Sequence, residues 1–457
     1  MRLVVVGGDA AGMTAASLVN RRRDDAEIVV IERGPYTSYS MCGIPYYVAG
    51  AIDEPEELVS RSPDEFRDTG MTVHMRTEAM AIDAQARTVA VCDLDRGVER
   101  TESYDALLCA TGAHPMVPDL PGLAAHGYVV HTLDEGEQLR RALERRDDVR
   151  TVAIVGAGYI GLEIAEALIE RGNAVHLIDR SPHVMRTLDE DMAQRLEEIL
   201  TDFGVQLHLG EDLQEIRHDE RRCRQVVTDA GCYEADAVVL AMGGKPNVGL
   251  AEAAGCAVGE SGALVVDERM RTTVPGIWAA GDVVESVDLV ADRRINVQLG
   301  THANKQGKVA GIDIAAQPDD GDATFPGLVG TAVTRLCRWD VARTGLTERE
   351  ATDAGIAYAA VSFTGTAVAG YMPDPGTVHV KMLAERDTGR VLGAQLLGTG
   401  NVAKRIDVAA VWCQLGVAVQ DAQFLDLSYA PPFGGVWDLL LVAARKLTTE
   451  LDLSPQL

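Results

Sequence analysis

The chain has 457 residues, enough for about three domains, and its 47% hydrophobic residues and 45 glycines are typical of a turn-rich α/β protein. Acidic residues outnumber basic ones, with 69 Asp and Glu against 42 Lys and Arg, which gives a net charge of −27. Because nucleic acids and anionic membrane surfaces repel such a charge, neither is expected as a partner.

The first residues are predicted to form a strand, a glycine-rich turn, a helix and a second strand. An apolar run at 3–6 leads into Gly7, Gly8 and Gly12, a helix is expected over about 13–22, and the strand 27–31 ends at Glu32. Glycines let the backbone approach a pyrophosphate, the helix N-terminus offers free N–H groups, and the terminal carboxylate suits a ribose diol. Asp9 stands where the second glycine of the usual G-x-G-x-x-G pattern falls, and its carboxylate would be repelled by a pyrophosphate unless it points away, which leaves the phosphate geometry open but not the fold.

A lone cysteine, Cys42, follows in the segment SYSMCGIPYY at 38–47. The position five residues later, where a second thiol would allow an internal disulfide, is Tyr47. A lone thiol must instead store its oxidised state as a mixed disulfide, a persulfide or a sulfenic acid. Gly43 and Pro45 suit the start of a helix, and a helix N-terminus is expected to lower the pKa of the thiol. The plain alternative is a buried structural cysteine.

A second strand-turn-helix-strand unit follows at 151–179. Its strand 152–155 leads into the turn formed by Gly156, Gly158 and Gly161, a helix is expected to end near 171, and the strand 174–178 ends at Asp179. Two complete units in one chain indicate two bound dinucleotides. Asp179 favours NADH, because a carboxylate repels a 2′-phosphate, whereas Arg180 and Arg186 keep NADPH open.

Three more apolar strands end in tight turns, at 104–112, 235–244 and 273–282. The last ends in an acid at the carboxyl end of a strand, where ligands of open α/β sheets bind. We therefore expect a first domain at 1–115 and 243–322, interrupted by a second dinucleotide domain at 116–242. After a polar linker at 315–323, a third domain at 323–457 is predicted to be mixed α/β. It has strand signals at 359–362, 377–382 and 390–397 and helix signals at 404–415 and 437–446. An extra domain of this kind often supplies an oligomer interface.

Neither a metal site nor an export signal is expected. The eight cysteines stand at 42, 92, 109, 223, 232, 256, 337 and 413 without a CxxC pair, and the ten histidines form no HxxxH motif. Cys109 and Cys413 lie in apolar stretches and are expected in the core. The first strand leaves no room for a signal peptide, and no apolar run reaches the roughly 20 residues of a membrane span. The expected location is therefore the cytoplasm, where thiols stay reduced.

These features together resemble the FAD-dependent pyridine nucleotide-disulfide oxidoreductases. The two units, Ala110-Thr111-Gly112, Ala280-Gly281-Asp282 and a cysteine about 30 residues past the first turn carry the resemblance. The single Cys42 is similar to the branch of coenzyme A disulfide reductases, NADH oxidases and NADH peroxidases, and most like the first. The resemblance implies an α/β fold with two Rossmann-like dinucleotide-binding domains, as in glutathione reductase, plus a C-terminal α+β dimerisation domain in a homodimer.

The resemblance also implies site residues. The motif that contacts FAD matches Gly7, Gly8, Gly12, Glu32, Arg33, Thr111, Gly112 and Asp282, and the motif for NADH or NADPH matches Gly156, Gly158, Gly161 and Asp179. Ala11, Ala79, Tyr159, Ile160, Gly243 and Gly281 complete the expected cofactor-binding set. Cys42 matches the nucleophile, Tyr429 a tyrosine that reaches the other subunit's flavin and thiol, and Tyr371 a second active-site tyrosine. Arg21 and Ser38 match positions that hold coenzyme A.

Three functions stay open. The favoured one passes electrons from NAD(P)H through FAD to Cys42, which reduces coenzyme A disulfide or a related small disulfide or persulfide. The alternative is an NADH oxidase or peroxidase that reduces oxygen or peroxide through a Cys42 sulfenic acid. The third is a non-catalytic redox sensor. Ala10 replaces the histidine usual in oxidases and peroxidases, which favours the first function, while Met41 and Trp437 replace an asparagine and a lysine expected with coenzyme A.

Overall fold

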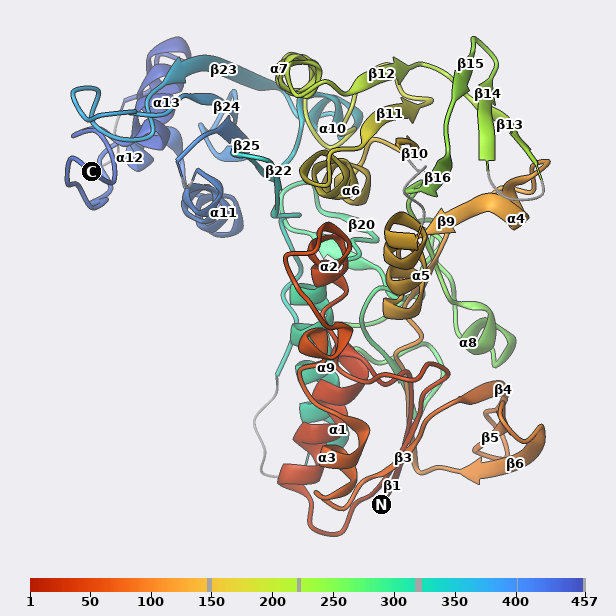
Figure 1. Ribbon diagram of the computed structural model, residues 1–457. Helices are drawn as coiled ribbons and strands as arrows, with labels where there is room; N and C mark the ends of the chain where they lie inside the picture. The colour runs from red at the N-terminus through yellow and green to blue at the C-terminus, as the bar shows by residue number, and fades with distance from the viewer. Residues whose placement is uncertain (146–149, 220–222, 317–322, 401, 455–457) are drawn as a thin grey trace.

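The computed structural model describes residues 1–145, 150–219, 223–316, 323–400 and 402–454. Within them, three five-stranded sheets organise the chain, and each lies in a different part of the molecule (Figure 1). The predicted linker at 315–323 lies largely outside the described residues. No helix of the described residues is both long and apolar enough to cross a bilayer.

The first sheet is parallel, in the order β18-β7-β1-β2-β3. Its strands are β1 (Arg2–Val6), β2 (Glu27–Ile31), β3 (Thr72–His74), β7 (Ala106–Cys109) and β18 (Ile277–Ala279). The strands read as continuous apolar runs because both faces are covered. Helices α1 (Ala10–Arg22) and α9 (Gly300–Ala315) pack against each other, and the hairpins of β4 (Thr77–Asp83), β5 (Thr88–Asp93) and β6 (Val98–Ser103) lie apart from them (Figure 1).

The second sheet is also parallel, in the order β12-β11-β10-β16-β9. It contains β9 (Gly127–Val129), β10 (Thr151–Val155), β11 (Ala174–Asp179), β12 (Gln206–Leu209) and β16 (Ala237–Leu240). Helices α5 (Leu133–Arg145), α6 (Tyr159–Glu170) and α7 (Glu190–Asp202) and a small antiparallel sheet of β13 (Leu213–His218), β14 (Cys223–Thr228) and β15 (Cys232–Glu234) pack around it. The first sheet combines strands from residues 2–109 with the strand at 277–279. All strands of the second sheet lie between these two segments, at 127–240. We therefore propose the division into 1–115 with 243–322, 116–242 and 323–457.

The third sheet is antiparallel, in the order β21-β22-β25-β24-β23. It contains β21 (Ala332–Leu336), β22 (Trp339–Gly345), β23 (Tyr358–Gly365), β24 (Val378–Glu385) and β25 (Val391–Gly398), with helices α11 (Ile406–Leu415) and α13 (Leu439–Glu450) packed on it. The predicted fold class is confirmed: two Rossmann-like parallel sheets and a C-terminal α+β unit. Cys109 and Cys413 are buried, as expected.

A buried ion cluster joins the second and third sheets. Lys381 of β24 is only 5% exposed, and its Nζ lies 3.3 Å from Asp189 and 2.6 Å from Asp191, at the start of α7. Glu348 of helix α10 (Glu348–Asp353) lies 2.9 Å from the same Nζ, and Gln395 donates to Asp189 at 2.7 Å. The cluster fixes the start of α7 against the C-terminal sheet.

Lys381→Met is expected to destabilise the protein by about 3 kcal/mol or more, because it leaves the buried Asp189 without its cation. Urea denaturation followed by tryptophan fluorescence measures the change. Lys404→Met is the matched control: Lys404 pairs with Asp407 in an exposed ion pair, which contributes less than about 1 kcal/mol. Equal midpoints for the two variants would contradict the importance of the cluster.

Candidate active site

The first glycine turn lies where β1 meets α1. Gly7 has a φ of +109° and donates its N–H to Ile31 at 2.9 Å. A Cβ on Gly12 would lie 1.9 Å from the Gly7 carbonyl oxygen, so only glycine fits this close approach of helix and turn. Gly156 and Gly161 repeat the arrangement in the second sheet, with a φ of +111° at Gly156 and the same 1.9 Å approach at Gly161. The two turns are thus built in the same way.

A carboxylate is held at the end of the second strand of each unit. Glu32 accepts the N–H groups of Gly8 and Gly34, both at 2.6 Å. Asp179 accepts those of Ala157 and Ser181, both at 2.7 Å. Because a carboxylate offers about four acceptor sites, each has capacity left for ribose hydroxyls.

The starts of helices α1 and α6 suit the phosphates of two dinucleotides, and a buried ring nitrogen of His302 is left to bind a ligand. No side chain caps α1 after Asp9 or α6 after Gly158, and a Cβ on Gly158 would point into open space. Their first N–H groups are therefore available to an anion. His302 is 9% exposed, and its Nδ1 has no protein hydrogen-bond partner. Its neighbour Ala303 packs against Gly281. The residues present fit two bound dinucleotides.

The other expected cofactor residues border these turns or lie further out. Thr111 donates to the Asn247 carbonyl at 2.9 Å, and a Cβ on Gly281 would lie 3.2 Å from Ala11. Burial raises the pKa of Asp282 to about 6. Gly112 and Gly243 both have positive φ. Ala79 is half-buried on β4, and Ile160 is exposed. Arg33 is also exposed, and its guanidinium Nη1 lies 3.7 Å from the Glu78 carboxylate.

Cys42 lies in a single 3₁₀ turn, Met41–Gly43, directly before helix α2 (Ile44–Ala49). Pro45 stands in the first turn of α2, as predicted. Cys42 is exposed, so the alternative of a buried structural cysteine is wrong. Tyr47 points the other way: it is 6% exposed, and the Arg140 guanidinium lies 4.4 Å above its ring. The place of a second thiol is therefore filled by a core aromatic.

The prediction that the helix N-terminus lowers the pKa of Cys42 is wrong: the residues of this chain raise that pKa. Although the residue is exposed to solvent, partial burial of its sulfur is the largest influence and raises the pKa of Cys42, and the carboxylates of Glu163 and Asp282 raise it further. Glu163 lies on α6, which packs against α2, and it accepts a hydrogen bond from the Thr334 hydroxyl at 2.9 Å. A backbone hydrogen bond at Cys42 lowers the pKa, but by less than burial and the two carboxylates raise it.

Glu163→Gln is expected to lower the pKa of Cys42 and so to speed its alkylation by iodoacetamide roughly threefold at neutral pH. The sign follows because the thiolate fraction rises as the pKa falls towards the working pH. Site-resolved mass spectrometry across a pH series gives the profile. Glu170→Gln, which removes an exposed carboxylate from the same helix, should leave it unchanged. A profile that Glu163→Gln does not move would show that this carboxylate has no influence on the thiol.

The two predicted active-site tyrosines lie together in the C-terminal unit. Tyr371 and Tyr429 are 74% and 47% exposed, and the Tyr429 hydroxyl is the largest influence that raises the pKa of Tyr371. Among the described residues of one chain, neither has a hydrogen bond or charge interaction with Cys42. The two predicted substrate residues are also apart: Arg21 is exposed at the end of α1, whereas the Ser38 N–H binds the Gly8 carbonyl at 3.1 Å, near its start.

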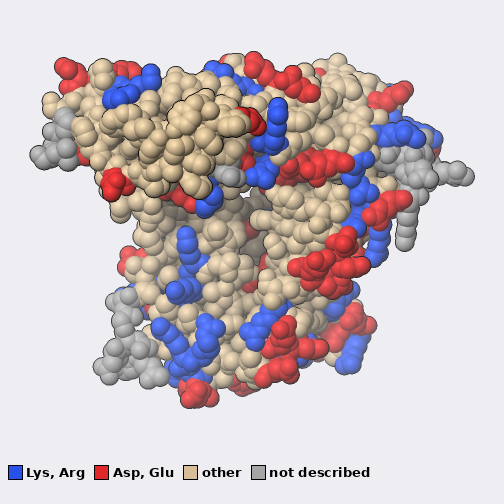
Figure 2. Space-filling view, turned by 60° about the vertical axis from the view of Figure 1, so that its left-hand side comes forward, with Lys and Arg blue, Asp and Glu red and all other residues tan. Residues whose placement is uncertain are grey.

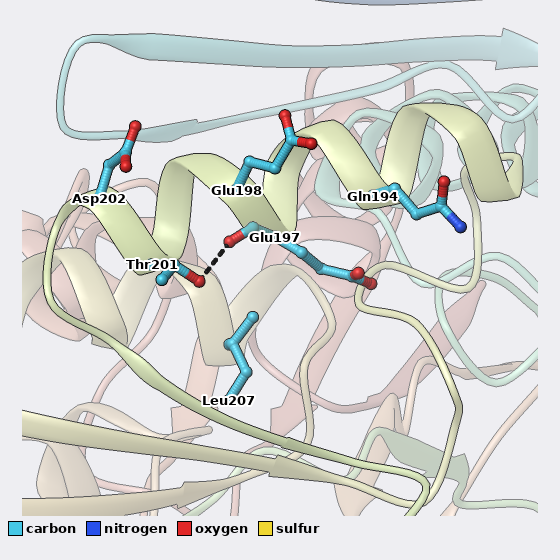
Figure 3. A pocket seen from close by; sticks show the side chains of 6 residues that line it. All are labelled: Gln194, Glu197, Glu198, Thr201, Asp202 and Leu207. Carbon is cyan, nitrogen blue, oxygen red and sulfur yellow. Dashed lines mark hydrogen bonds between the residues drawn. The ribbon is translucent and has the colours of Figure 1, made fainter.

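Sequence reasoning missed Glu163 and His302. Glu163 directly follows the second glycine turn in the run GYIGLE, but only the packing of α2 on α6 brings it to Cys42. His302 belongs to no local motif. A separate pocket between α7 and β12 is lined by Gln194, Glu197, Glu198, Thr201, Asp202 and Leu207 (Figure 3). It has no thiol and does not suit sulfur chemistry.

Comparison with known proteins gives consistent matches over nearly the whole chain. The pattern of the pyridine nucleotide-disulphide oxidoreductases matches residues 1–307, and that of their dimerisation domain matches 331–439. A relative from Pyrococcus horikoshii, an NAD(P)H coenzyme A polysulfide/persulfide reductase, is 38% identical over 98% of each chain. An NADH oxidase from Methanocaldococcus jannaschii is 33% identical, over 99% of this chain and 100% of its own. The structure of an NAD-dependent persulfide reductase from A. fulgidus has a TM-score of 0.95 and 36% identity, over 99% of this chain and 84% of its own.

Proposed function

Because the chain belongs to the pyridine nucleotide-disulphide oxidoreductases, we propose that it reduces a low-molecular-weight disulfide or persulfide, such as that of coenzyme A, with Cys42. Its cofactors are FAD and NAD(P)H, which when bound supply two electrons at a time to sulfur. The observation that carries the proposal is the exposed lone thiol of Cys42 with Tyr47 buried in the place of a second one. Such a thiol needs its substrate to supply the other sulfur.

The chemistry of Cys42 follows from thiol–disulfide exchange. Its thiolate attacks one sulfur of the substrate disulfide, a bond forms between the two sulfurs, and the other half leaves as a thiolate. With a persulfide, the leaving group is hydrosulfide. Two electrons and one proton then split the mixed disulfide, release the second thiol and restore the Cys42 thiolate. A tyrosine hydroxyl within hydrogen-bond reach could donate that proton, and Tyr429 of a second copy is the proposed donor.

The placement of basic residues favours a long, anionic thiol. Ser38 lies near the start of α1 and Arg21 near its end, roughly 16 Å along the helix axis. Asn304 of α9 bonds to Thr14 of α1 at 2.8 Å, and the exposed Lys308 follows one turn later. Lys and Arg side chains gather low on the face in Figure 2, where α1 and α9 lie. A pantetheine arm could carry a thiol to Cys42 while its nucleotide phosphates meet Arg21.

A homodimer is part of the proposal, because large apolar side chains are exposed on the C-terminal unit: Tyr371, Phe424, Tyr429, Phe433, Val436 and Trp437. A second copy would cover them and bring its Tyr429 to Cys42 of the first. Phe433→Glu is expected to weaken self-association at least about thirtyfold, or ~2 kcal/mol, because it puts a charge in the interface.

Analytical ultracentrifugation measures that self-association. Val98→Glu is the matched control, since Val98 is an exposed apolar residue of β6, outside the C-terminal unit. It should leave the association unchanged. An unchanged dimer in Phe433→Glu would contradict this surface as the interface.

One experiment tests the function against its alternative. NADH oxidation is measured under argon with coenzyme A disulfide, and oxygen uptake is measured with NADH alone. Disulfide-dependent oxidation that exceeds oxygen uptake is the expected result. Oxygen uptake that accounts for all NADH consumed would favour the oxidase, which the identity with the M. jannaschii NADH oxidase keeps as the second candidate. Absence of turnover with either acceptor would favour a redox sensor.

A further inference from the structure

Asp9 occupies a helix-capping position without capping the helix. It is the N-cap residue of α1, where an aspartate usually accepts an N–H of its own first turn. Here no side-chain cap bond forms. Instead, Oδ1 of Asp9 accepts the backbone N–H of Tyr39 at 3.1 Å. The carboxyl group therefore binds the segment that leads to Cys42, and of its own helix it interacts with the adjoining Ala10 N–H.

A second bond joins the same two segments. The N–H of Ser38 binds the carbonyl oxygen of Gly8 at 3.1 Å, so consecutive N–H groups point to consecutive residues of the turn. Ser38 has a φ of +48°, a left-handed conformation that is strained for a non-glycine residue. On the other side, Ser60 donates to Ser38 and Ser40 donates to Leu58, both at 2.8 Å. The bonds to the turn and to 58–60 together hold this strained segment.

The charges that face Asp9 are unfavourable to its carboxylate. Burial is the largest influence and raises its pKa to about 7, and Glu32 and Asp282, at the ends of β2 and β18, act in the same direction. The N–H groups of Tyr39 and Ala10 oppose the rise. The charge of Asp9 also raises the pKa of Cys42, by less than burial, Glu163 and Asp282 do. A glycine, the usual residue at this place, would neither bind Tyr39 nor influence the thiol.

We propose that Asp9 is a positioning residue for Cys42: its carboxyl group fixes the Tyr39 N–H, and with it the approach to the 3₁₀ turn that carries the thiol, against the first dinucleotide turn. Tyr39 stands three residues before Cys42, and the 3₁₀ turn begins at Met41. The role rests on the proposed function only in that Cys42 is the reacting thiol. Asp9 thus joins the cofactor turn to the reactive segment by one side chain.

Hydrogen–deuterium exchange of the purified, flavin-bound protein tests the contact. Asp9→Ala and Asp9→Gly remove the acceptor, and loss of about 1 kcal/mol of hydrogen bond corresponds to roughly fivefold faster exchange at the Tyr39 amide. Asp9→Asn keeps an acceptor oxygen and should stay within about twofold of the native rate. Asp202→Ala, at the exposed end of α7, is the control and should not change this exchange. If Asp9→Ala does not fold, the exchange is measured on Asp9→Gly, which places the usual residue of this turn at the position.

The pH profile of Cys42 alkylation, measured on the same variants, separates hydrogen bond from charge. All three substitutions remove the charge and should move the profile to lower pH, whereas only Ala and Gly should speed exchange. Native exchange in Asp9→Ala and Asp9→Gly would overturn the proposal, as would equal acceleration in Asp9→Asn. Neither measurement requires turnover, so failure of the proposed function would be seen separately, in the acceptor assays.

Discussion

Replacing Cys42 with serine is expected to lower turnover of coenzyme A disulfide or persulfide at least about a thousandfold, or ~4 kcal/mol in the activation free energy. A serine hydroxyl is not ionised at neutral pH and cannot form the mixed disulfide. Reduction of the bound flavin by NADH should survive, because it does not involve the thiol. Steady-state assays with the disulfide and anaerobic loss of the flavin's visible absorbance with NADH measure the two steps separately.

Cys232→Ser is the matched control for this substitution. Cys232 is also exposed but lies at the start of β15, beside the second sheet, so its loss should leave both steps unchanged. Unchanged disulfide turnover in Cys42→Ser would contradict the central proposal. Loss of flavin reduction as well would mean that the substitution disturbs cofactor binding rather than sulfur chemistry.

Local patterns explain why so much of the two dinucleotide units was predicted from the sequence. The strand predicted at 27–31 is found at Glu27–Ile31, since an apolar run between turns describes a buried parallel strand well. The first helix was predicted to begin near 13 but begins at Ala10. Gly12 weakens the local helix signal, yet it is the one residue that fits against Gly7.

Contacts between distant segments account for what the sequence did not reveal. The prediction for the Cys42 pKa considered only the adjoining helix end, whereas burial of the sulfur, and after it Glu163 and Asp282 from other elements, shift the pKa the opposite way. The Lys381 cluster likewise joins strand, helix and loop residues that share no motif. The sequence left the geometry at Asp9 open, and its partner, the Tyr39 N–H, follows only from the fold.

Nucleotide choice provides the second large expected effect, through Asp179 at the end of β11. Its two oxygens are held by Ala157 and Ser181 and have acceptor sites left for ribose hydroxyls. Asp179→Ala removes a charged acceptor, which is worth about 2 kcal/mol, so kcat/KM for NADH should fall roughly thirtyfold. The value for NADPH should fall less, because the repulsion of its 2′-phosphate disappears with the carboxylate.

The measurement is the ratio of steady-state kcat/KM for NADH to that for NADPH. Effects of the substitution on the flavin or on Cys42 change both values equally and cancel in this ratio. Glu198→Ala, which removes an exposed carboxylate of α7, changes the net charge equally and should leave that ratio unchanged. An equal fall for both nucleotides in Asp179→Ala would mean that the carboxylate only braces the turn through Ala157 and Ser181. A selective fall for NADH would instead make Asp179 the residue that recognises the ribose, because NADPH has a 2′-phosphate in place of the 2′-hydroxyl that the carboxylate binds.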